Sequence, residues 1–166
     1  MDAVTLQSRI YDWLATHYPD GPQWNHEGFH CFKDCHPIVR SLLAMDAVEG
    51  EISNGAWGQL LWNTFPNWRV VLDLAKDGYA SMKATQQVDA IPLLYAKFSD
   101  YEKGCRAAMQ RADNGNFEKE FGGFTSIGYS DAKFKPQLVL LDPELESLRR
   151  RWLEQNRDVV LAATAA

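Results

Sequence analysis

The chain lacks the features that define several large classes of protein. No apolar run approaches the roughly 20 residues that a membrane-spanning helix needs. The N-terminus, Met1-Asp2-Ala3-Val4, has no positive region before an apolar one, so the sequence predicts no signal peptide. Cysteines number only three, and this odd count fits a reducing cytosol better than a disulfide framework. These absences predict a cytoplasmic protein that does not insert into membranes.

An excess of positive charge is also lacking. The net charge is −5, and residues 1–67 carry eight acidic residues against three basic ones, whereas residues 68–166 carry fourteen of each. An acidic half repels nucleic acid and anionic membranes and favours basic protein partners. An imbalance of this size also fits ordinary solubilising charge. The basic run 149–151 is expected to be solvated or to pair with Glu146, Glu154 and Asp158.

Sequence signatures of catalysis are missing as well. No serine stands in a Gly-x-Ser-x-Gly elbow, and the glycine-rich stretches 114–116 and 121–125 lack the Lys-Ser or Lys-Thr ending of a phosphate-binding loop. Cys31 or Cys105 could pair with a histidine, but no family signature surrounds either cysteine. The sequence therefore predicts neither catalytic residues nor a cofactor.

The hydrophobic patterning predicts an all-α, single-domain bundle over residues 1–166. About six to seven helices are expected, with a long irregular N-terminal segment at 17–36 and a Gly-rich loop at 113–136 before the last helix. Helices are predicted over 3–16, from Pro37 to about Ser53, from Trp57 to Thr64, and from an Asn67 cap to Gly78. The six tryptophans are expected to lie mostly in the core.

The C-terminal half is predicted to be divided by its prolines. Residues 80–112 stay helical in pattern, with Pro92 starting a separate helix, and 137–141 form a strand-like run without a partner. The last helix is expected to have Asp142 as N-cap and Pro143 in its first position, with Leu145, Leu148, Trp152 and Val159 inward.

One stretch, from Glu51 to Asn63, places polar side chains where a helix pattern breaks and restarts. Asn54-Gly55 is the breaker, because both residues tolerate a left-handed backbone. Gln59 and Asn63 lie four apart and share a helix face. Glu51 is expected to turn toward the N–H groups that open the second helix. We interpret Glu51, Asn54, Gly55, Gln59 and Asn63 as a structural motif that joins two core helices.

The spacing Glu-x-x-Asn-Gly-x-x-x-Gln-x-x-x-Asn of this stretch resembles the signature of the DNA mimic protein 19 family, catalogued as domain of unknown function 4375. Gly78-Tyr79 and the segment from Leu141-Asp142 to Asn156 are similar to two further family segments, and the resemblance covers about residues 37–160. The family usually has two glycines after the asparagine, whereas Ala56 takes the second place here. The resemblance implies an all-helical bacterial domain that lacks catalytic residues and binds other proteins. The named member presents acidic side chains in place of DNA phosphates.

A cluster of potential metal ligands lies in the irregular segment: His26, His30, Cys31, Cys35 and His36. Zinc takes four such ligands in a tetrahedron, but this spacing matches no standard zinc module. Packed or surface residues are therefore the preferred interpretation. A zinc- or thiol-dependent enzyme centred on His26–His36 remains the alternative from a different functional class.

The leading hypothesis is a non-enzymatic inhibitor that docks on a basic surface of a partner, either a toxin, as an immunity protein would, or a DNA-binding protein. The candidate partner-binding residues are Asp12, Asp20, Trp24, Asp34, Asp46 and Glu49. Trp24 is included because tryptophan is enriched at interface hot spots. A structural homodimer is a further alternative, and direct nucleic-acid or membrane binding is not expected.

Overall fold

The computed structural model describes residues 2–21, 24, 33–131 and 133–165. The prediction of an all-α fold is confirmed, since these residues contain helices and no strand. The elements are α1 (Ala3–His17), α2 (Pro37–Thr64), α3 (Trp68–Ser81), α4 (Thr85–Arg111), the π-helical segment η1 (Ala112–Asn116), α5 (Phe117–Ser130), α6 (Lys135–Leu140), α7 (Glu144–Gln155) and α8 (Arg157–Ala163).

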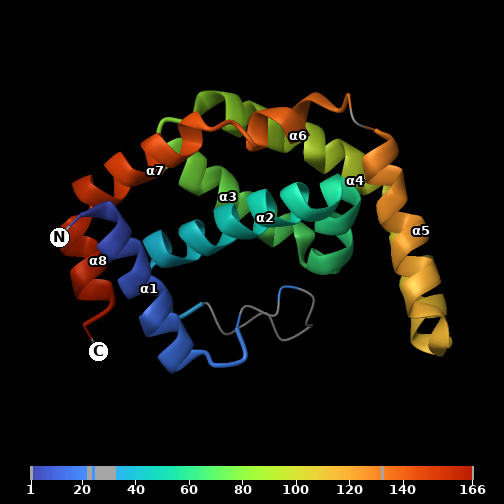
Figure 1. The fold of residues 1–166 in the computed structure, drawn as a ribbon, viewed down its shortest axis with the longest axis horizontal. Coiled ribbons are helices and arrows are strands. Elements are labelled where there is room, and N and C mark those ends of the chain that lie inside the picture. Colours follow the sequence, from blue (N-terminus) through green and yellow to red (C-terminus); the bar gives the residue numbers. More distant parts are fainter. Residues whose placement is uncertain (1, 22–23, 25–32, 132, 166) are drawn as a thin grey trace.

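Helix α2 runs through the middle of the molecule and links its two ends (Figure 1). Helices α1, α7 and α8 gather with both termini at one end, and α5 lies at the opposite end. The most extensive packing joins α2 to α3 and to α5. A side chain of α2 therefore contacts different neighbours depending on its position along the helix.

The N-terminal helices form for the reasons that the sequence suggested. Asp2 accepts a hydrogen bond from the Thr5 backbone N–H at 2.9 Å, which caps α1, and Leu6 and Ile10 on its inner face are fully buried. Pro37 occupies the first turn of α2, where its missing N–H costs nothing. These two helices begin within a residue of the predicted positions.

Aromatic rings fill the core around α2, α3 and α4. Trp57 packs 4.7 Å from Tyr101, and Trp68 packs 5.5 Å from Phe98, measured between ring centroids. Trp57, Trp68 and Phe98 are fully buried, as expected for most of the tryptophans. This part of the core is thus built from residues on three consecutive helices.

Two predicted helix ends were wrong. Helix α4 continues through Pro92, because Ile91, Leu94 and Phe98 are fully buried on its inner face and this packing outweighs one lost backbone hydrogen bond. Helix α3 continues past Gly78 to Ser81. A β-carbon at Gly78 would lie 2.7 Å from the Met45 sulfur, so this glycine serves close packing rather than helix termination.

The predicted loop at 113–136 and the strand-like run at 137–141 were also wrong, because this region contains η1, α5 and α6. Phe117, Phe121 and Phe124 lie at helical spacing and pack their rings 6.3, 5.6 and 5.8 Å from Trp62 of α2. Gly128 allows close approach, since a β-carbon there would lie 2.6 Å from the Gly58 backbone nitrogen. Large rings and a small glycine together fix α5 against α2.

The last predicted helix is two helices. The Asp142 side chain accepts from the Glu144 backbone N–H at 2.9 Å, but α7 begins at Glu144, one residue later than predicted, with Pro143 at its N-cap position. The helix ends at Gln155, however, and α8 restarts at Arg157. After this break Val160 is fully buried while Val159, the predicted inward residue, is 38% exposed.

Candidate functional site

The structure brings Glu51, Gln59 and Asn63 of the sequence motif together. One Glu51 carboxylate oxygen accepts from the Gln59 and Asn63 side-chain amides, both at 2.8 Å. The expected bond from Glu51 to backbone N–H groups was wrong. The Trp57 backbone N–H instead donates to Gln137 on α6 at 2.7 Å. Glu51 therefore binds the two side-chain amides, while Gln137 accepts from the backbone at the start of the second half of α2.

The turn between the two halves of α2 lies at Gly55 and Ala56. Gly55 has φ −154° and Ala56 has φ +57° with ψ −168°, a conformation that only glycine adopts readily. A β-carbon at Gly55 would lie 2.0 Å from the Gln59 side-chain oxygen. The Tyr129 hydroxyl of α5 donates to the Asn54 carbonyl oxygen beside this turn. Neighbouring helices thus hold the strained backbone in place.

A second polar cluster joins α2 to α7 and α3. Arg149 donates to the two Glu49 carboxylate oxygens at 2.6 and 2.7 Å, lies 3.5 Å from an Asp46 oxygen and also pairs with Glu146 at 3.4 Å. The Tyr79 hydroxyl donates to Glu49 at 3.1 Å. The prediction that Glu146 pairs with the basic run is confirmed here and at Arg150. Asp46 and Glu49, predicted to meet a partner, therefore face an arginine of the same chain.

Burial is the largest cause of the raised pKa values in this cluster. It raises the pKa of Asp46 to about 6, against the opposing effect of the nearby Arg149 charge. Burial and the neighbouring Glu49 carboxylate raise the pKa of Tyr79 well above its usual value. Tyr79 therefore stays neutral at physiological pH and acts as a hydrogen-bond donor.

The candidate metal ligands are not brought together as far as the structure describes them. His26, His30 and Cys31 lie outside the described residues. Cys35 is buried, and His36 caps α2 by accepting from the Ile38 backbone N–H at 3.3 Å. Among residues 2–21, 24, 33–131 and 133–165, no group of three or more His, Cys, Asp or Glu side chains could hold a metal ion.

The other cysteine considered for nucleophilic chemistry lies in α4. Cys105 is fully buried, and its burial raises the pKa of the thiol to about 12. Such a thiol stays protonated at neutral pH and has no access to a substrate. We interpret Cys105 as a core residue.

The remaining predicted partner-binding residues divide into surface and core. Asp12, Asp20 and Asp34 are exposed. Trp24 is buried, with 9% of its surface accessible, so the prediction of an exposed anchor was wrong. The Trp24 carbonyl oxygen accepts from the Asn67 side-chain amide nitrogen at 2.9 Å, and Asn67 stands at the N-cap of α3 without a side-chain capping hydrogen bond.

Two exposed apolar side chains of α1 were not identified from the sequence. Val4 is 55% exposed and Tyr11 is 37% exposed, and Tyr11 directly precedes Asp12. The helical pattern alone could have placed both outside, since they lie off the stripe of Leu6, Ile10 and Leu14.

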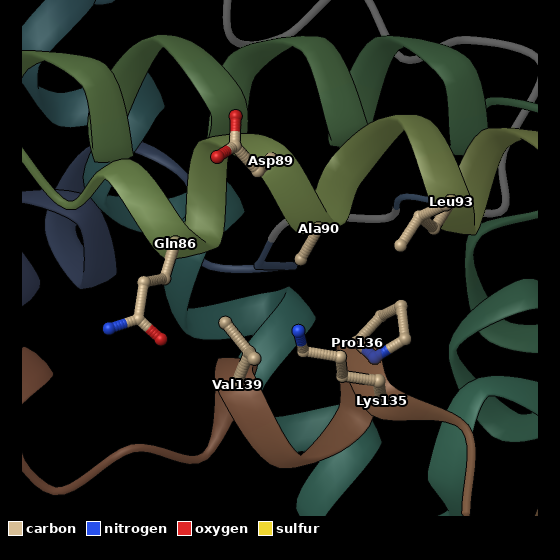
Figure 2. Close-up of a pocket in the computed structure, with 7 residues that line it drawn as sticks. All are labelled: Gln86, Asp89, Ala90, Leu93, Lys135, Pro136 and Val139. Atoms are coloured by element: carbon tan, nitrogen blue, oxygen red, sulfur yellow. The ribbon is translucent and has the colours of Figure 1, made fainter.

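A small groove between α4 and α6 was also missed. It encloses about 150 Å³ and is lined by Gln86, Asp89, Ala90, Leu93, Lys135, Pro136 and Val139. Figure 2 shows Ala90 and Leu93 on one side and Pro136 and Val139 on the other. Sequence reasoning could not find this groove, because it treated the second wall as loop and strand.

The fold and these sites define an all-helical protein with polar clusters that hold helices together. The family model described as DMP19-like protein matches residues 33–156, and the chain belongs to this family. The family is not a known enzyme family. Neither the curated proteins nor the solved structures provide a match. In the described part of the chain, every helix is too short or too polar to span a membrane.

Proposed function

We propose that this protein is a non-enzymatic inhibitor that docks through an acidic face on a basic surface of another protein. The observation that carries the proposal is the charge arrangement around α1. Arg9 is the one lysine or arginine between positions 2 and 21, and its guanidinium donates to the Thr164 hydroxyl at 2.7 Å and to the Thr164 carbonyl oxygen at 3.0 Å. Asp12 and Asp20 stay exposed, with no ion pair to a described residue. The exposed charges that this stretch offers to a partner are therefore acidic, whereas exposed arginines lie on α7 and α8.

The same surface offers apolar contact area. We define the α1 surface as Val4, Tyr11, Asp12 and Asp20, and Asp34 adds a further exposed carboxylate. Acidic side chains accelerate encounter with a basic partner, whereas anchors such as tyrosine supply much of the binding energy after contact. The combination is typical of a protein that recognises another protein.

Membership of the family supports protein binding over catalysis. Two forms of the proposal rely on the same attraction between exposed acidic residues and a basic partner surface. An immunity protein would cover the basic site of a toxin. A DNA mimic would compete with DNA for a DNA-binding protein. Both need exposed acids, and the partner decides between them.

Affinity capture tests the proposal. The immobilised full chain is exposed to a lysate of its native cell at low salt, and bound proteins are identified by mass spectrometry. Asp12→Asn/Asp20→Asn is expected to lose a specific basic partner. Asp113→Asn/Glu118→Gln removes the same number of exposed charges at the α5 end and is expected to retain it (Figure 1).

The captured partner then separates the two forms. Displacement of DNA from it by the protein identifies a DNA mimic, and restored growth or activity of a poisoned target identifies an immunity protein. Equal retention by both double variants would contradict docking through α1.

A further inference from the structure

A cavity of about 410 Å³ opens at the end of the molecule where α2 begins, α3 ends and α7 meets α8. Its polar lining comprises His36, Ser41, Asp77, Ser81 and Asn156. Trp152, Pro37, Ile38 and Val159 form its apolar wall. None of these residues belongs to the α1 surface or to the Arg149 cluster.

The polar lining is rich in unused hydrogen-bond acceptors. The Ser81 hydroxyl already donates to the Gly78 carbonyl oxygen at 2.7 Å, and the Asn156 amide nitrogen donates to the Trp152 carbonyl oxygen at 2.8 Å. The Ser81 hydroxyl oxygen and the Asn156 amide oxygen therefore remain as acceptors. Asp77 is exposed and forms no ion pair or hydrogen bond with a described residue, so its carboxylate adds acceptors and a negative charge.

Ser41 of α2 adds a further hydroxyl to the polar lining. Its residue is 8% exposed, and a serine hydroxyl can either donate or accept a hydrogen bond. Sequence reasoning did not single it out, because Ser41 lies within an otherwise apolar helical run.

We propose that this cavity receives an arginine side chain of the partner, and this inference rests on the proposed function. A guanidinium has five N–H donors and no acceptor, which complements the Asp77, Ser81 and Asn156 oxygens. Trp152, which is 5% exposed, belongs to the apolar wall of the same cavity and can report on an occupant.

The donors near the cavity do not oppose this assignment. His36 accepts from Ile38 through Nδ1, so its neutral ring carries hydrogen on Nε2, and the exposed ring leaves that donor able to bond water. Lys83 and Arg151 line a different hollow of about 230 Å³, which shares only Ser81 and Trp152 with this one. Among the described residues that line the cavity there is no lysine or arginine.

Titration of the full chain with N-acetyl-L-arginine amide tests the assignment without the partner. The Trp152 indole N–H signal, identified with Trp152→Phe, is followed by NMR. A saturable shift is expected, with a dissociation constant of roughly millimolar order, typical of a single side chain. N-acetyl-L-citrulline amide has nearly the same shape without the charge and is expected to leave the signal unmoved.

Variants distinguish a specific site from general attraction. Asp77→Asn and Ser81→Ala are each expected to weaken arginine-amide binding about fivefold or more, because each removes or weakens an acceptor of the guanidinium. Asp113→Asn, which removes an exposed charge far from the cavity, is expected to bind as the natural chain does. No saturable shift, or equal shifts with citrulline amide, would overturn the assignment. That result would leave docking through α1 standing, since the capture experiment tests α1 separately.

Discussion

Arg149 of α7 donates to both carboxylate oxygens of Glu49 of α2, across 100 positions of sequence. The Arg149 side chain is 8% exposed, whereas the neighbouring Arg150 side chain is 56% exposed and pairs with Glu146. Two adjacent arginines therefore hold different roles, one inside the fold and one on its surface.

This difference predicts unequal costs of removing the two charges. Arg149→Met is expected to destabilise the fold by about 3–5 kcal/mol, because it leaves Glu49 and Asp46 partly buried without a counter-charge. Arg150→Met removes an exposed pair and is expected to cost about 1 kcal/mol or less. Urea unfolding followed by circular dichroism gives both values, and equal costs would show that the Arg149 cluster is not structural.

Asp46 is expected to make stability depend on pH. Its folded-state pKa of about 6 lies above the unfolded value of 3.8, so the folded protein binds the proton more tightly. The resulting stabilisation is complete below about pH 3.8 and is lost as the pH rises through about 6. Asp46→Asn mimics the protonated form and faces the same Arg149, Glu49 and Glu146 groups.

The variant should therefore gain stability relative to the natural chain as the pH rises from about 4.5 to about 7.5, by about 2 kcal/mol. Unfolding free energies of both proteins at the two pH values measure this gain. A variant effect of the same size at both pH values would rule out Asp46 as the titrating group.

Glu51 is expected to have a structural role, which is to stabilise the turn between the two halves of α2. Glu51→Ala leaves the Gln59 and Asn63 amides without their charged acceptor and should cost about 1–3 kcal/mol. Ser53→Ala, at an exposed position two residues away, should change stability by about 0.5 kcal/mol or less. Chemical denaturation compares them, and a cost for Glu51→Ala no larger than that of Ser53→Ala would refute the structural interpretation.

Ala56 carries backbone strain that glycine would relieve. The family resemblance places a second glycine at this position, and the observed φ of +57° with ψ −168° explains the preference. Ala56→Gly is therefore expected to stabilise the protein by about 1 kcal/mol, although glycine normally destabilises a helix. Thermal unfolding measures the change, and a lower melting temperature would contradict the strain argument.

Local patterns in the sequence predicted the helices that begin with strong signals. Each of these signals acts through its own backbone neighbours, so the sequence alone predicts the helix start. The signals are Asp2 before α1, Pro37 in α2 and Asp142 before α7. The sequence also predicted part of the polar motif, because Gln59 and Asn63 are four residues apart and share one face of a helix. Membership of the family was predicted from the same stretch and is confirmed.

Long-range packing explains the predictions that failed. Proline and glycine end a helix only where the burial of neighbouring side chains does not offset their cost. At Pro92 and Gly78 the packing that offsets this cost involves other helices, which local sequence does not reveal. Asp46 and Glu49 were predicted to bind a partner because Arg149, which they face, lies about 100 residues away in the sequence. Phe117, Phe121 and Phe124 lie at helical spacing, but the glycines of the same segment are typical of a loop.

The most direct test of the central claim is the salt dependence of partner association. The association rate of the captured partner is measured by stopped-flow fluorescence from about 0.05 M to about 0.5 M salt. Docking through the α1 surface predicts a rate that falls about tenfold or more for the natural chain. The Asp12→Asn/Asp20→Asn variant should associate more slowly at low salt and respond less to salt. An association rate that does not change with ionic strength would contradict the account.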